Sequence, residues 1–267
     1  MAPSGWTYET NGEHFAAYLL RNHIDGESLQ SHVPLSLLST GRGMEWSEAL
    51  REMTVLHLER RLIAAASALC DRSPEWDSVV ERDIKQMIID TMTVDYFEVS
   101  AIYERLVPAV RSARQTIRAG VHRELESEAK RVGSWCYLCG ADLDFIGDQP
   151  TSFTLDHVWP RAYGGNSDPE NLLPACESCN ARKGNVPSWA LYPIQALVAG
   201  YQLEASDFEL IPKEMRFAVL ARSASKLAES EGVSLKEAYV VMGRPTLFRI
   251  ADMSTSVDVF NLVAQVT

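Results

Sequence analysis

The sequence contains no apolar run approaching the roughly 20 residues that a membrane-spanning helix needs. Its first residues lack a basic segment followed by an apolar one, which is the arrangement of a secretory signal. It also contains no internal repeat and no low-complexity tract. These absences favour a globular protein without a membrane segment, and we expect it to act in the cytoplasm.

Positive charge is scarce as well. The 267 residues include 25 basic and 36 acidic side chains, which gives a net charge of −11. Each of the segments 1–130, 131–187 and 188–267 carries a net negative charge, so no segment is basic overall. Nucleic-acid-binding proteins usually present a basic surface. Any grip on nucleic acid must therefore come from a local patch, a bound cation or a partner.

Cysteine is rare, but its spacing is informative. Cys70 lies alone in an apolar stretch, and we interpret it as a buried structural thiol. The other four form two C-x2-C pairs separated by 36 residues, namely Cys136, Cys139, Cys176 and Cys179. Zinc prefers four ligands at tetrahedral corners, and thiolates suit it. The sequence therefore predicts a Zn²⁺ site, and four protein ligands make it structural rather than catalytic.

The patterning of the chain divides it into three regions. Residues 1–132 are mostly helical in pattern, most clearly over 46–72, where apolar residues recur every three or four positions. Residues 133–187 are richer in turn-forming residues and contain a strand-like run at 152–158. Residues 188–267 return to a helical pattern, with a helix expected over 214–231 and a capping box from Ser234 to Glu237. We predict a mainly α protein with a small α+β module between helical N- and C-terminal regions.

Three polar residues within the cysteine-framed segment suggest chemistry. His157 follows Asp156, and a neutral imidazole beside a carboxylate can act as a general base toward water. The Asp156 carboxylate offers a hard oxygen to Mg²⁺ or Mn²⁺, and Asn180 offers an amide oxygen from the start of an expected helix. Together they predict a hydrolytic site with one divalent cation.

A run of arginines precedes this segment. Arg111, Arg114 and Arg118 are spaced to lie near one face of a helix expected over 96–120. Such a stripe could contact phosphates of a nucleic acid. A solvated face or ion pairing with acidic residues explains it equally simply, and we favour that interpretation.

The segment as a whole resembles the HNH endonuclease family, in its version with two cysteine pairs. About 55 of the 267 residues carry the resemblance. Its elements occur in the order C-x2-C at 136–139, Asp-His at 156–157 followed by Pro160 and Gly164-Gly165, Asn171-Leu172, and C-x2-C at 176–179 followed by Asn180 and Lys183.

This resemblance implies a ββα-metal fold, with two strands and a helix around the catalytic ion. It implies that His157 activates water and that Asp156 and Asn180 hold the divalent cation. It implies that Asn171 fixes the loop that orients His157. Lys183 and Arg161 are the candidates for phosphate contact within the segment. The last of the three letters is often His in this family, and Asn180 stands in that place here.

The resemblance also guides the choice of substrate and partner. DNA is favoured over RNA, and an RNA substrate such as transfer RNA is the alternative for the same site. The acidic helical flanks could dock a partner protein such as an ATPase, in a bacterial restriction or anti-phage defence system. A zinc-bound adaptor that binds nucleic acid or protein without cutting is the alternative of another class.

Overall fold

The computed structural model describes residues 6–24, 43–72, 76–147, 149–185 and 213–245. The chain forms two compact units, each assembled from segments distant in the sequence. We call the first, mainly Tyr8–Ile117 and Trp159–Asn171, the helical unit. We call the second, mainly Arg118–Val158 and the chain from Leu172 onward, the sheet unit. The expected boundaries near residues 132 and 188 therefore differ from the limits of these units.

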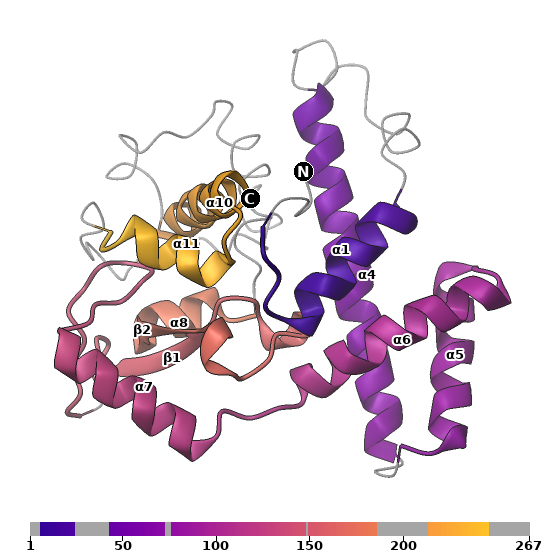
Figure 1. Ribbon diagram of the computed structural model, residues 1–267, viewed down its shortest axis with the longest axis horizontal. Helices are drawn as coiled ribbons and strands as arrows, with labels where there is room; N and C mark the ends of the chain where they lie inside the picture. The colour runs from indigo at the N-terminus through magenta and orange to yellow at the C-terminus, as the bar shows by residue number, and fades with distance from the viewer. Residues whose placement is uncertain (1–5, 25–42, 73–75, 148, 186–212, 246–267) are drawn as a thin grey trace, which may run out of the picture. The chain divides into compact units, whose positions relative to one another are not determined.

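The helical unit contains four helices in its described part: α1 (Asn11–Asn22), α4 (Gly43–Arg72), α5 (Ser78–Met92) and α6 (Tyr96–Ala113). Helix α1 packs on α4 and α6, and α5 packs on the same two helices (Figure 1). The helix expected over 46–72 is α4. The core contains fully buried apolar side chains from each helix, including Phe15, Leu62, Ile88 and Leu106.

Polar side chains determine where three of these helices begin. Thr10 accepts a hydrogen bond from the Glu13 amide, and the Glu13 carboxylate accepts one from the Thr10 amide, forming a capping box at α1. Asp77 caps α5, and Asp95 caps α6. Each cap satisfies amide donors that have no partner inside the helix.

The helix expected over 96–120 is two helices, so the arginine stripe considered for it does not lie on one helix. Helix α6 continues through Pro108 and ends at Ala113, and α7 (Ala119–Val132) begins only after Arg118. Arg111 is therefore in α6, Arg114 is the residue after its last turn, and Arg118 precedes α7. These three side chains do not share one helix face.

The segment Trp159–Asn171 joins the two strands of the sheet but groups with the helical unit. It contains two short 3-10 turns, η1 (Arg161–Tyr163) and η2 (Pro169–Asn171). Turn η1 contacts α4 and α6. Trp159 and Tyr163 are buried there, so this part of the expected nuclease module belongs to a helical core.

The sheet unit is built on two antiparallel strands, β1 (Phe153–His157) and β2 (Leu172–Cys176). Asp156 pairs with Leu173, and His157 pairs with Leu172. Helix α8 (Glu177–Lys183) follows β2 directly and contacts both strands. Helices α10 (Lys213–Glu231) and α11 (Leu235–Met242) pack on each other, and α10 also contacts α8 (Figure 1).

The described residues confirm the predicted fold class, a mainly helical protein with a small two-stranded sheet. The strand expected at 152–158 is β1, the helix expected at 214–231 is α10, and the Ser234 capping box opens α11. Among the described helices, none combines the length and apolar character that crossing a bilayer requires.

Candidate active site and zinc site

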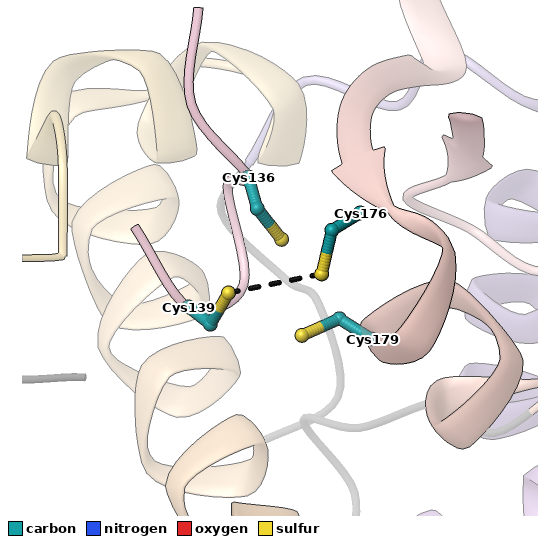
Figure 2. Close-up of side chains that lie close together, drawn as sticks. All are labelled: Cys136, Cys139, Cys176 and Cys179. Atoms are coloured by element: carbon teal, nitrogen blue, oxygen red, sulfur yellow. Dashed lines mark hydrogen bonds between the residues drawn. The ribbon is translucent and has the colours of Figure 1, made fainter. Parts of the chain in front are cut away.

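The four paired cysteines converge in the sheet unit. Cys136 and Cys139 lie on a tight turn in which the Gly140 amide donates to the Cys136 carbonyl at 2.7 Å. Cys176 ends β2, and Cys179 lies in the first turn of α8. Figure 2 shows all four sulfur atoms pointing toward a common centre. The two pairs thus clamp together the start and the end of the ββα segment.

The cluster fits a tetrahedral zinc ion. All four thiols are buried, and their sulfur atoms lie within 4.8 Å of one another. A Zn–S bond of about 2.3 Å gives an S···S distance of about 3.8 Å across a tetrahedron. The Sγ atoms of Cys139 and Cys176 are 3.8 Å apart (Figure 2). A zinc ion held by all four thiolates would have no open coordination position, which is the arrangement of a structural site.

Asp156 lies on β1 and is buried among polar groups. The Tyr137 hydroxyl donates a hydrogen bond to Asp156 Oδ2, and the Lys183 ammonium lies 2.9 Å from the same oxygen. Burial, followed by the charge of Asp156, raises the pKa of Tyr137, so its phenol keeps the proton it donates. Within the described residues, Asp156 Oδ1 has no hydrogen-bond partner. One carboxylate oxygen is therefore fixed, and the other is available to a ligand.

Lys183 does not point outward as a phosphate-contacting lysine would. Its side chain is 3% exposed, and Nζ also donates to the His157 carbonyl at 2.7 Å. Moving this ammonium to a phosphate would leave the buried Asp156 carboxylate without its cation, which is costly. The structure therefore disagrees with the expected phosphate contact and makes Lys183 a strut between α8 and β1.

Asn180 faces the same strand from α8. Its Nδ2 donates to Thr154 Oγ1 at 3.0 Å and to the Leu155 carbonyl at 3.3 Å. Thr154 and Asp156 lie on one face of β1, because side chains alternate along a strand. Asn180 lies three residues before Lys183, so both project from one side of the helix. The two predicted cation ligands thus lie on facing surfaces of β1 and α8, with Asn180 Oδ1 free of protein donors among the described residues.

His157 is the last residue of β1 and is half-buried. Its backbone carbonyl is held by Lys183, so the end of the strand is anchored to α8.

Asn171 belongs to the helical unit and is 2% exposed. Its Oδ1 accepts from the Trp159 amide at 2.7 Å, and its Nδ2 donates to the carbonyls of Trp159 and Asn166, each at 2.9 Å. A Cβ at Gly165 would lie 1.9 Å from the Trp159 carbonyl oxygen, so only glycine leaves room for this arrangement. Asn171 therefore ties both ends of the segment that joins β1 to β2.

The predicted phosphate-binding arginines have other partners in the helical unit. Arg111 stacks its guanidinium over Trp76 at 4.9 Å, and Arg114 lies 2.6 Å from Asp71. Arg161 donates to the Ala113 carbonyl at 3.1 and 3.3 Å. In the sheet unit, Arg118 is exposed just before α7.

The sequence did not single out the two tyrosines beside Asp156. Tyr137 lies between the two cysteines of the first C-x2-C pair. Its place in the predicted zinc turn could have marked it as a residue close to the site. Tyr239 lies in α11 and packs edge-on against the Tyr137 ring, with centroids 4.9 Å apart. Burial, followed by the Asp156 charge, raises the pKa of Tyr239. Nothing in the local sequence of α11 indicates this contact.

Comparison with known proteins identifies the same segment. The family model described as HNH endonuclease matches residues 136–186. A 59-residue stretch is 36% identical to the CRISPR-associated endonuclease Cas9 of Corynebacterium diphtheriae, covering 22% of this chain and 5% of that protein. No solved structure matches the chain. The match spans both cysteine pairs, β1, β2 and α8, and residues 136–186 are an HNH endonuclease domain.

Proposed function

We propose that this protein is a metal-dependent endonuclease that hydrolyses phosphodiester bonds. The observation that carries the proposal is the pairing of Asp156 on β1 with Asn180 on α8, next to His157 at the end of β1. Each of the two cation ligands is held by protein hydrogen bonds through one atom and keeps one oxygen available. This arrangement suits a small divalent cation, which prefers oxygen ligands.

Asp156 Oδ1 and Asn180 Oδ1 would hold Mg²⁺ or Mn²⁺. When bound, that cation supplies positive charge at the scissile phosphate. Tyr137 and Lys183 fix the other Asp156 oxygen, so the carboxylate is oriented before any ligand arrives. Asn180 is oriented in the same way by Thr154.

His157 would act as the general base. A ring nitrogen takes a proton from water, the water oxygen bonds to phosphorus, and the bond from phosphorus to the leaving oxygen breaks. Asn171 would act on His157 indirectly, because it binds the backbone of Trp159, two residues further along the chain.

DNA is the proposed substrate, with RNA, including transfer RNA, as the alternative. Hydrolysis at the phosphate does not distinguish them, so the support for DNA is the resemblance of the segment to the HNH endonuclease family. The chain spans 5% of the relative it matches, so that relative's own activity does not define this protein's substrate.

A partner protein is part of the proposal. The net charge of −11 gives the chain little attraction for polyanions, and the candidate arginines of the helical unit are engaged with its own residues. A partner such as an ATPase in a cytoplasmic restriction or anti-phage system would supply substrate engagement. A purified chain that is a fully active monomer would contradict this part of the proposal.

The rival function is a non-catalytic zinc-bound adaptor. An adaptor needs the cysteine clamp but has no use for a carboxylate and an amide that each keep an oxygen available. The geometry at Asp156 and Asn180 therefore favours the nuclease.

The test is a cleavage assay on supercoiled plasmid and on total RNA, with Mg²⁺ or Mn²⁺ and with chelator. It compares the wild type with His157→Ala and with His57→Ala as the matched control, because His57 is exposed on α4. We expect metal-dependent cutting that His157→Ala abolishes and His57→Ala retains, with unchanged zinc content in both. Equal cutting by the wild type and His157→Ala would refute the assignment of the base, and the substrate that is consumed decides between DNA and RNA.

A further inference from the structure

The segment Trp159–Asn171 is held by the helices of its own unit through backbone groups. The Gly12 amide of α1 donates to the Gly164 carbonyl at 3.1 Å. The Arg161 guanidinium donates to the Ala113 carbonyl at the end of α6. The Ser167 hydroxyl donates to the Gln115 carbonyl at 3.2 Å, beyond the same helix end. The segment is thus bonded to α1 and to the end of α6.

The closest approach between the segment and α1 is at Gly12. A Cβ there would lie 1.9 Å from the Tyr163 carbonyl oxygen and 2.5 Å from Trp159 Nε1. These two groups are bonded to each other, because Trp159 Nε1 donates to the Tyr163 carbonyl at 2.6 Å. Glycine inside a helix costs about 0.5–1 kcal/mol relative to alanine. A glycine at this place is explained by the close approach of the segment to α1.

The contact reaches the candidate active site through the covalent chain. Trp159 is two residues after His157, and Asn171 immediately precedes the first residue of β2. Asn171 binds the Trp159 backbone, so displacement of Trp159 displaces both ends of the segment. The zinc ligands lie outside the segment, in the other unit, and do not depend on this contact.

We infer that α1 is a positioning element of the endonuclease, with Gly12 as its closest contact, and that it sets the place of Trp159 and therefore of His157. The inference rests on the proposed function for its catalytic consequence. The segment Trp159–Asn171 lies within the HNH domain at 136–186, but the helices that hold it lie outside that domain.

The experiment compares full-length Gly12→Ala with full-length Gly120→Ala. Gly120 is also in a helix, but a Cβ there would meet nothing within 4 Å, so this variant controls for the substitution itself. For Gly12→Ala we expect kcat to fall about 100-fold, the loss associated with a misplacement of about 1 Å, at unchanged KM. Zinc content and far-UV circular dichroism should match the wild type. Gly120→Ala should have the wild-type kcat.

Hydrogen exchange gives a readout that does not depend on cutting. The amides of the segment should exchange faster in Gly12→Ala than in Gly120→Ala, while those of β2 and α8 near the cysteines keep their protection. Wild-type kcat and wild-type exchange in Gly12→Ala would overturn the inference. If the purified wild type cuts neither substrate, that result bears on the proposed function alone, and the exchange comparison still decides whether Gly12 holds the segment in place.

Arg161→Gln covers the case in which Gly12→Ala fails to fold. It removes the guanidinium bonds to Ala113 without placing an atom in a closed space. A positioning role predicts lower kcat at unchanged KM and an unchanged salt dependence. A raised KM with a weaker salt dependence would indicate a phosphate contact instead and would overturn the role assigned to Arg161.

Discussion

Asn171→Asp is the substitution that most directly tests the proposed role of Asn171. The two side chains have nearly the same shape, so packing is retained. The oxygen that accepts from the Trp159 amide also remains. The Nδ2 group, which donates to the carbonyls of Trp159 and Asn166, is replaced by an oxygen that cannot donate.

The expected loss of folding free energy follows from the two carbonyl groups that lose their hydrogen-bond donor. Each buried acceptor left without a partner costs about 1–3 kcal/mol, so the pair costs roughly 2–6 kcal/mol. Asn171 is 2% exposed, so water does not replace the lost donors there. A domain is stable by about 5–15 kcal/mol. We therefore expect opening of the segment between β1 and β2 in an otherwise folded chain.

The assay combines urea unfolding, zinc content and cleavage. We expect a lower midpoint of unfolding, one zinc per chain as in the wild type, and loss of metal-dependent cutting. Asn22→Asp is the matched control, because Asn22 is exposed at the end of α1. Its stability should change by no more than about 0.5 kcal/mol. A stable, fully active Asn171→Asp variant would refute the proposal that these bonds hold the segment between β1 and β2 in the place that cutting requires.

Three further substitutions test other parts of the structure. Cys176→Ser should lose zinc and cooperative unfolding of the sheet unit, since metal binding contributes to folding, whereas Cys70→Ala should keep one zinc by metal analysis. Lys183→Met should destabilise the protein in urea by about 3–5 kcal/mol, because it leaves the Asp156 charge buried without its cation; wild-type stability would contradict the strut role. Burial raises the pKa of Glu59 well above its usual value, and among the described residues neither of its carboxylate oxygens has a hydrogen-bond partner. Its neutral form is the stable one in the fold, so its contribution is present at low pH and is lost as pH rises toward the raised pKa. Glu59→Gln should therefore raise the free energy of unfolding at pH 8 more than at pH 5, by about 1.4 kcal/mol for each pH unit between 5 and 8 that lies below the raised pKa. An equal effect at both pH values would contradict this.

The sequence alone determined the features that depend on a few neighbouring residues. Two C-x2-C pairs specify four thiolates, and their spacing specifies a clamp, so the convergence of Cys136, Cys139, Cys176 and Cys179 was predictable. The strand at β1 was predictable from its strand-forming composition, and the helix at α10 from the recurrence of apolar residues every three or four positions. The start of α11 was predictable because the Ser234 cap and its Glu237 partner are three residues apart.

Only the tertiary structure decided which side chains face the candidate site and what holds them. The sequence position of Lys183 suggested a phosphate-binding lysine. In the fold its ammonium is buried against the Asp156 carboxylate of β1. Tyr239 reaches Tyr137 from a helix about one hundred residues further along the chain. Gly12 lies in a helix whose local sequence gives no sign of the segment that it contacts. Local patterns encode ligand types, caps and periodicity, whereas the close packing of distant segments depends on the whole fold. The clamp of four cysteines was therefore visible in the sequence, and the contacts of the segment between β1 and β2 were not.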